Sequence, residues 1–326
     1  MAELRRDPLT GRSVILAASR AERPHDVVVP AAAPNPSVPA VDDVVADCPF
    51  CPGHEDRTPP EVARVGPGAP DSTGWQVRVV PNLYPFVGGV DGEASAGDDL
   101  RRHRPAGGVH EVAVLSPAHH RPLGRLDDDQ VLLVLRALQE RVRAHAAAGH
   151  PVTQVMVNHG AGGGASLAHP HAQLVAIDLV PPVIEQEVAH VAPGGRCVLC
   201  RELERHHGDD PLDVAGGDAP LWCPWWSSTP YELLLAPRHH RARFEEAGDE
   251  LRAVATRLRE GLARLDERLG DPPYNVILHT LPGGLTDDFH WHVHVRPRLQ
   301  VEAGFELGTG ILVNTLDPEV AARALR

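Results

Sequence analysis

The segment 158–173 of this 326-residue chain reads NHGAGGGASLAHPHAQ. Its glycine-rich part predicts a turn whose backbone N–H groups can approach phosphate oxygens closely, because glycine carries no side chain. His169 and His171 follow two residues apart, and on a strand such a pair points to the same face of the sheet. Both histidines could bind a metal, or one could bind a metal while the other reacts. A glycine loop followed by a metal-binding strand without catalysis is the alternative.

Secondary structure is expected in the same order in the two halves of the chain. Apolar patterns predict, in order, strands at 75–80 and 112–115, a helix at 126–148 and strands at 154–157 and 173–177. The second half repeats the strand–helix–strand–strand order at 232–235, 244–269, 275–278 and 291–295. We therefore expect an α+β fold of two homologous units, residues 1–185 and 186–326. Each unit is expected to be an antiparallel sheet with a packed helix, and the two form an internal pseudo-dimer.

The cysteines and histidines repeat as well. Cys48 and Cys51 form a C-x-x-C pair, and Cys197 and Cys200 form another in the second half. Each pair is followed by two histidines that are 50 residues apart in both halves, His119 and His169 in the first and His240 and His290 in the second. Two thiolates and two imidazoles make a tetrahedral zinc site. The sequence predicts two structural zinc ions, each contributing on the order of 10 kcal/mol of coupled folding free energy.

Other interpretations of these residues stay open at this point. A single C-x-x-C pair can be two reduced buried thiols or a redox couple. In the second half, His239 and His292 compete with the proposed ligands. Cys223 belongs to neither pair, and we expect it to be buried.

Composition limits the function classes. The formal net charge is −13 and the pI is about 5.8, which argues against nucleic acid as a partner. All 31 basic residues are arginine, so no lysine can act in catalysis. Without a long apolar run or a signal-peptide pattern, the chain is expected to be soluble and cytoplasmic, with no membrane association. Residues 29–47 and 88–108 are expected to be flexible surface loops.

These features together resemble galactose-1-phosphate uridylyltransferase, a branch of the histidine-triad superfamily. The resemblance covers nearly the whole chain. It rests on DPLTG at 7–11 with Arg20 and Arg23, on PNLY at 81–84, on the HPH-x-Q motif at 169–173 and on GFE at 304–306. It implies that both units are histidine-triad-like.

The resemblance also implies residue roles. His171 would be the nucleophile that carries the nucleotide, and Gln173 would donate to the phosphoryl oxygens. Ser166 and Gly164 would line the phosphate cradle. The remaining nucleotide- and substrate-binding positions would be Arg20, Arg23, Asn82, Asn158, Phe305 and Glu306. The alternative for Arg20 and Arg23 is that both are solvated surface residues that bind no substrate.

A further metal is implied by the same resemblance. A metal site that some family members carry is matched by Glu187, His279, His292 and His294. It would bind a further metal ion, zinc or iron. The alternative is that His292 and His294 simply face the core or the solvent, since His290 and His292 lie close together in sequence.

The sequence also departs from the uridylyltransferase pattern. The lysine expected before Gly304 is missing, and the ending GFELGTG at 304–310 looks more like plant ADP-glucose phosphorylases, which also have two C-x-x-C zinc sites. The leading hypothesis is ping-pong transfer of UMP from UDP-glucose to galactose 1-phosphate, in galactose metabolism. The first alternative is another nucleotide-sugar phosphorylase or nucleotidyltransferase.

Two more distant alternatives are a histidine-triad hydrolase, which Gln173 disfavours because hydrolases usually place a third histidine there, and a zinc-stabilised binding module without turnover. The resemblance implies a homodimer in which each site borrows residues from the partner's C-terminal segment. It further implies a nucleotide sugar and a sugar 1-phosphate as ligands.

Overall fold

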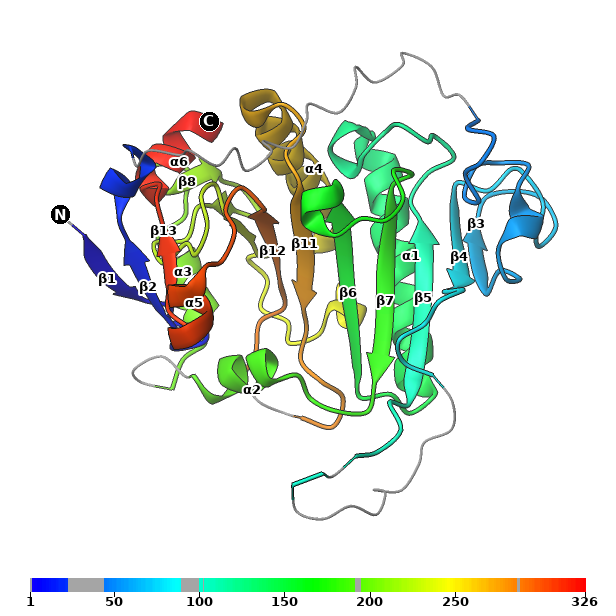
Figure 1. Ribbon diagram of the computed structural model, residues 1–326, viewed down its shortest axis with the longest axis horizontal. Helices are drawn as coiled ribbons and strands as arrows, with labels where there is room; N and C mark the ends of the chain where they lie inside the picture. Colours follow the sequence, from blue (N-terminus) through cyan, green and yellow to red (C-terminus); the bar gives the residue numbers. More distant parts are fainter. Residues whose placement is uncertain (1, 23–43, 89–99, 102, 191–194, 286–287) are drawn as a thin grey trace.

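The computed structural model describes residues 2–22, 44–88, 100–101, 103–190, 195–285 and 288–326. It is a mixed α+β fold built around one large antiparallel sheet (Figure 1). Across this sheet the strands follow in the order β3-β4-β5-β7-β6-β11-β12-β10-β9-β8. Their bounds are, in chain order, β3 Ala63–Val65, β4 Val77–Pro81, β5 Gly108–Val114, β6 Val152–His159, β7 His171–Ile177, β8 Asp213–Ala215, β9 Leu221–Trp222, β10 Leu233–Leu235, β11 Tyr274–His279 and β12 His292–Pro297.

A second, three-stranded sheet lies at one side of the molecule (Figure 1). It consists of β1 (Glu3–Arg6), β2 (Ser13–Leu16) and β13 (Leu312–Asn314), and β13 pairs with β2 in parallel. The α-helices are α1 Asp128–Ala147, α2 Pro182–Ala189, α3 Val198–Leu203, α4 Glu250–Leu269, α5 Gly304–Thr309 and α6 Pro318–Leu325.

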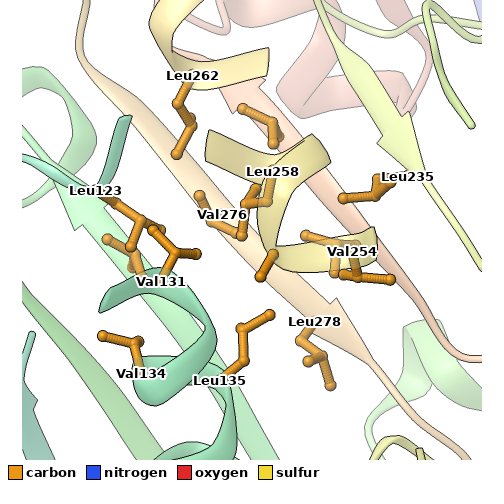
Figure 2. Close-up of a cluster of buried hydrophobic side chains, with 14 of the residues drawn as sticks. Leu123, Val131, Val134, Leu135, Leu235, Val254, Leu258, Leu262, Val276 and Leu278 are labelled. Atoms are coloured by element: carbon orange, nitrogen blue, oxygen red, sulfur yellow. The ribbon is translucent and has the colours of Figure 1, made fainter. Parts of the chain in front are cut away.

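The two long helices cover one face of the large sheet. Val131 and Leu135 of α1 meet Val254 and Leu258 of α4 above Val276 of β11 (Figure 2). Strand residues alternate between faces, so every second side chain of the central strands joins this core. Burying one such side chain stabilises the fold by roughly 1.5–3 kcal/mol.

Both long helices have ends that the sequence encodes. Asp127 caps α1, because its side chain accepts a hydrogen bond from the Gln130 N–H. Gly270 ends α4 in the left-handed conformation at φ +70°, which glycine adopts without strain.

The other face of the sheet is polar in its middle and apolar near its two sides. Near one side Cys48, Cys51 and Phe50 pack with Val112 and Val114 of β5. Near the other, a matching cluster consists of Leu9, Cys197, Leu199, Leu203, Trp222, Trp226, Leu234 and Ala236. The central strands β7, β6, β11 and β12 lie between these two clusters and carry the polar residues described below.

The predicted elements are present, but the two expected sheets are one. β6 and β11 pair antiparallel along their edges, with Asn158 opposite Asn275, and this pairing joins the halves. Counted from the outer edge, the order is β3-β4-β5-β7-β6 in one half and β8-β9-β10-β12-β11 in the other. The predicted boundary at 185–186 lies inside α2, and the division into two homologous units stays a prediction.

Several element boundaries differ from those expected. The helix predicted at 244–269 is divided into a short 3₁₀ turn, Phe244–Glu246, and the helix α4. Gly248 lies between them, and Asp249 is the N-cap residue at which α4 begins. Most of the loop predicted at 29–47, and residues 89–99 and 102 of the loop predicted at 88–108, lie outside the described residues. Among the helices that the structure describes, none is long and apolar enough to cross a membrane.

Candidate functional site

The glycine-rich segment forms a tight loop between β6 and β7. It contains a 3₁₀ turn, Ala161–Gly163, and Gly164 closes it at φ +85°, a conformation that L side chains rarely adopt. Gly163 must be glycine for a different reason, since a Cβ there would lie 2.7 Å from the carbonyl oxygen of Tyr274. Gly164 and Ser166 are exposed, so the loop presents its backbone to solvent.

One side chain of the neighbouring strand holds this loop. Asn275 of β11 donates from Nδ2 to the carbonyl oxygen of Gly163 at 2.7 Å and to Oδ1 of Asn158 at 2.8 Å. Asn158 therefore lies at the base of the loop with its own amide still able to donate. The β6–β11 pairing brings the two asparagines together, and it joins residues 117 positions apart.

His171 begins β7, at the end of the sheet opposite α2 (Figure 1). Its side chain is buried, and burial lowers its pKa below the ordinary value. The imidazole is therefore neutral at pH 7. Its Nδ1 lies 2.9 Å from the carbonyl oxygen of His169, so Nδ1 carries the proton and donates it. The lone pair is left on Nε2, which is the arrangement a nucleophilic imidazole needs.

Gln173 follows on the same face of β7. Its Oε1 lies 2.9 Å from Nε2 of His110, a buried residue of the neighbouring strand β5. Nδ2 of Asn82 lies 3.0 Å from the same ring nitrogen. His110, which the sequence analysis did not predict, thus contacts two predicted site residues, Asn82 and Gln173, through one ring nitrogen.

The first zinc-ligand set comes together as predicted. Cys48, Cys51, His119 and His169 are buried, with their ligand atoms within 4.8 Å of one another. Zinc bonds of about 2.3 Å to sulfur and about 2.0–2.1 Å to nitrogen at tetrahedral angles place S and N about 3.5 Å apart. The Sγ–Nδ1 distances are 3.3 Å for Cys51–His119, 3.6 Å for Cys48–His169 and 3.7 Å for Cys51–His169.

Further contacts orient these ligands. His169 Nε2 lies 2.9 Å from the carbonyl oxygen of Ser116, so Nε2 donates and the Nδ1 lone pair faces the thiols. Burial lowers the pKa of His169 to about 4 and raises that of Cys48 to about 11. Burial thus favours the neutral thiol of Cys48, and a bound cation would be needed to hold it as thiolate. The residues fit a tetrahedral metal ion.

The second set, Cys197, Cys200, His240 and His290, also converges, and it is more open to solvent. Cys200 Sγ lies 3.2 Å from His240 Nδ1 and 3.6 Å from His290 Nδ1. Asp288 contacts the other ring nitrogen of His240 at 3.1 Å. His239, which competed with His240 in the sequence, does not belong to the converging group.

The third set lies where β11 and β12 meet α2. Glu187, His279, His292 and His294 are all buried. His292 donates from Nδ1 to the carbonyl oxygen of His290 at 2.9 Å, so its Nε2 lone pair faces His294 Nε2 at 3.1 Å. Burial lowers the pKa of His294 to about 4. Two facing imidazole nitrogens lie beside the Glu187 carboxylate, whose Oε2 has no hydrogen-bond partner in the part of the chain that the structure describes. These atoms form a donor set that fits a cation.

His290 and His292 therefore divide between two sets. His290, just before the start of β12, has its Nδ1 3.6 Å from Cys200 Sγ, whereas His292, the first residue of β12, faces His294. The two histidines therefore belong to different groups, which the sequence had left open.

Three other predicted site residues, Arg20, Phe305 and Glu306, lie apart from His171 within one chain. Arg20 lies in a 3₁₀ turn, Ala18–Glu22, directly after β2, and Phe305 and Glu306 lie in α5, just before β13. β2 and β13 are on the other side of β11 and β12 from β7 (Figure 1). Arg23 lies outside the described residues.

The sequence analysis assigned no site role to two residues of the site, His110 and Asn275. His110 was missed because the strand was expected to start at 112, although the alternation from Val112 places residue 110 on the same face. Asn275 was placed in a strand, but its partners come from the other half of the chain. No local pattern signals that contact.

Comparison with known proteins identifies the family of this chain. The model of the galactose-1-phosphate uridyl transferase N-terminal domain matches residues 1–181. The chain belongs to the galactose-1-phosphate uridylyltransferase family. Its members are nucleotidyltransferases and related phosphorylases that bind nucleotide sugars and sugar phosphates, and this chain is an enzyme of that class.

Relatives of this uridylyltransferase family member match over its full length. ADP-glucose phosphorylase of Arabidopsis thaliana is 31% identical over 99% of this chain and 92% of the relative. Galactose-1-phosphate uridylyltransferase of Thermotoga maritima is 25% identical over 100% and 98%, respectively. The crystal structure of the Arabidopsis phosphorylase with bound ADP-glucose has a TM-score of 0.82 and 28% identity, covering 100% of this chain and 99% of that one. A uridylyltransferase structure has a TM-score of 0.74 and 27% identity, with 100% and 97% coverage.

Proposed function

We propose that this enzyme transfers a nucleoside monophosphate through a covalent intermediate on His171. The observation that carries the proposal is the fixed orientation of that ring. Its Nδ1 proton is donated to the His169 carbonyl oxygen, and its neutral Nε2 is free to react. In the first step Nε2 attacks the α-phosphorus of a nucleotide sugar. An N–P bond forms, and the bond to the sugar 1-phosphate oxygen breaks.

In the second step a phosphate oxygen of the acceptor attacks the same phosphorus and the N–P bond breaks. His171 then regains its starting state, so the overall transfer is ping-pong. Gln173 and the loop at Gly164 and Ser166 are proposed to donate to the phosphoryl oxygens, whose negative charge grows in the transition state. Asn158 and Asn82 are proposed to bind the nucleotide.

For the substrates we propose UMP transfer from UDP-glucose to galactose 1-phosphate. The match of residues 1–181 to the uridyl transferase domain supports it. A second candidate is an ADP-glucose phosphorylase activity, in which inorganic phosphate accepts AMP. The full-length similarity to the Arabidopsis enzyme supports this candidate.

We propose zinc at the two Cys₂His₂ sets and zinc or iron at the set of Glu187, His279, His292 and His294. Bound zinc would supply structural cross-links between distant segments. In the first set the His169 ring is a proposed ligand, and the His169 carbonyl oxygen accepts the hydrogen bond from His171 Nδ1. The proposed metal ligand and the proposed nucleophile are thus connected through one short stretch of backbone.

The two halves are proposed to be homologous units, residues 1–185 and 186–326. Matched positions support this: 119 and 240, 158 and 279, 169 and 290, 171 and 292, and 173 and 294 are each 121 residues apart. The proposed reactive residues of the first half, Asn158, His171 and Gln173, thus correspond to the metal-binding histidines of the second.

We further propose a cytoplasmic homodimer. Arg20, Phe305 and Glu306 lie apart from His171 in one chain, and a second copy would supply the equivalent residues to each site. Small-angle scattering or sedimentation of the full chain tests this arrangement.

The nucleophile is tested by the intact mass of the protein after incubation with UDP-glucose or with ADP-glucose. We expect a gain of one nucleoside monophosphate that is absent in His171→Asn. A UMP adduct supports the uridylyltransferase, and an AMP adduct supports the phosphorylase. An adduct that persists in His171→Asn would exclude His171 as the nucleophile.

A further inference from the structure

His110 sits between the residue proposed to bind nucleotide and the residue proposed to bind phosphate. The residue is 5% exposed, and the Phe86 ring packs against its imidazole at a centroid distance of 4.5 Å. Its Nε2 is 2.9 Å from Gln173 Oε1 and 3.0 Å from Asn82 Nδ2. Its Nδ1 is buried and has no hydrogen-bond partner among the described residues.

The two contacts of Nε2 require opposite protonation of that nitrogen. Gln173 Oε1 is an acceptor and requires Nε2–H. Asn82 Nδ2 is a donor and requires a lone pair on Nε2. In this structure the Asn82 amide is oriented in this way because Asn82 Oδ1 accepts the Tyr84 N–H at 2.8 Å. One neutral ring nitrogen cannot satisfy both, so one contact must yield.

The lack of a polar partner for the buried Nδ1 among the described residues favours one of the two contacts. In the Nδ1–H tautomer a buried N–H would have no acceptor there, and unpaired buried N–H groups are rarer in proteins than unpaired acceptors. The Nε2–H tautomer leaves only an unpaired lone pair at Nδ1, and its proton bonds to Gln173. When Asn82 turns to a nucleotide, its competing amide leaves His110, and the Nε2–H bond to Gln173 is the one that remains.

We propose that His110 is a positioning residue that donates its Nε2 proton to Gln173 Oε1 and thereby turns the Gln173 NH₂ group toward the phosphoryl site. The proposal rests on the proposed function of Gln173. Without His110 the Gln173 amide can rotate by half a turn and present its oxygen, which repels a phosphate. Through Asn82, nucleotide binding and the orientation of Gln173 are coupled.

The test is a double-mutant cycle on the full, zinc-loaded protein, with single-turnover formation of the nucleotide adduct from UDP-glucose and from ADP-glucose. His110→Leu removes the donor to Gln173 and is expected to slow adduct formation roughly 10- to 100-fold. This is less than most of the range of about 100- to 1000-fold for loss of an oxyanion donor itself, because Gln173 remains in place. The KM should change much less. His110→Gln keeps an N–H near the same place and should recover most of the rate.

In a Gln173→Ala background, His110→Leu should cause no further loss, because His110 acts only through Gln173. His207→Leu, an exposed histidine outside the site, is the matched control. Additive losses, or a His110→Gln variant as slow as His110→Leu, would overturn the proposal.

A second measurement is independent of turnover. Two-bond ¹H–¹⁵N correlation spectra report which ring nitrogen of His110 carries the proton, with His110→Leu used to assign the signal. We expect Nε2–H in the substrate-free protein. An Nδ1–H tautomer that persists with bound nucleotide would refute the positioning role. If neither nucleotide sugar labels the wild type, the proposed function fails while this spectrum still decides the state of His110.

Discussion

The Nδ1 atom of His171 lies 2.9 Å from the carbonyl oxygen of His169, the neighbouring histidine whose own ring faces Cys48 and Cys51. This contact fixes the tautomer of the proposed nucleophile through the backbone of a proposed zinc ligand. The same contact recurs in the second half, where His292 Nδ1 lies 2.9 Å from the carbonyl oxygen of His290. In that half Nε2 of His292 lies 3.1 Å from Nε2 of another histidine, His294.

Loss of the first metal site should therefore impair chemistry as well as stability. We expect Cys48→Ser to lower the zinc content by one ion per chain, to lower Tm, and to slow adduct formation on His171. The destabilisation should exceed the roughly 0.5–3 kcal/mol of an ordinary substitution, because metal binding contributes on the order of 10 kcal/mol. Elemental analysis and thermal unfolding measure it.

Cys223→Ser is the matched control, since Cys223 is buried but belongs to none of the converging sets. It should leave the zinc content unchanged. Equal metal content in Cys48→Ser and the wild type would rule out Cys48 as a ligand.

The hydrogen bonds of Asn275 should support the glycine loop. Asn275→Ala removes two donors to Gly163 and Asn158, and at about 1 kcal/mol each we expect a loss of roughly 2 kcal/mol in unfolding free energy. The KM for the nucleotide sugar should rise. Asn275→Asp should be no better, because a carboxylate cannot donate to either oxygen. Denaturant unfolding and steady-state kinetics test both variants, and a fully active Asn275→Asp would contradict this role.

As the pH is lowered, the rate of adduct formation should begin to fall only below the pH at which an ordinary histidine is protonated. Burial lowers the pKa of His171 from 6.5, so its Nε2 keeps a lone pair when an exposed histidine would already be protonated. The unfolded chain binds the proton first as the pH falls. Stability from this residue is therefore complete above pH 6.5 and is lost as the pH drops toward the folded-state pKa.

Single-turnover labelling between about pH 5 and pH 8, checked by intact mass, measures this limb. The rate should stay nearly constant through pH 6.5 and decline only below it. An inflection above pH 6.5 would contradict the depressed pKa of the nucleophile.

The third set should bind a metal separately from the first two. Glu187→Gln removes the carboxylate charge that the three imidazoles surround, and we expect the total metal content to fall by one ion while the two C-x-x-C sites stay filled. Elemental analysis of the protein purified without chelator provides the count. A total of two ions in both wild type and variant would mean that this set holds none.

The sequence alone determined the local parts of this protein. Apolar spacing placed α1 and α4, the C-x-x-C pairs and their histidines indicated two groups of possible metal ligands, and the HPH-x-Q motif marked the strand that carries the proposed nucleophile. Each of these signals lies within a short segment, where helix and strand periods and ligand spacing operate directly. The expected strand starts were less reliable. One strand was predicted to begin at residue 112 instead of Gly108, so His110 was not identified as a site residue.

Only the tertiary structure decided how the halves meet. The β6–β11 pairing merges the two expected sheets and brings Asn275 to the glycine loop of the other half. The tertiary structure places His290 and His292 in different metal-ligand groups, and it buries His110 with no partner for its Nδ1 among the described residues. Hydrogen bonds and desolvation of this kind depend on residues far apart in the chain, so no local pattern contains them.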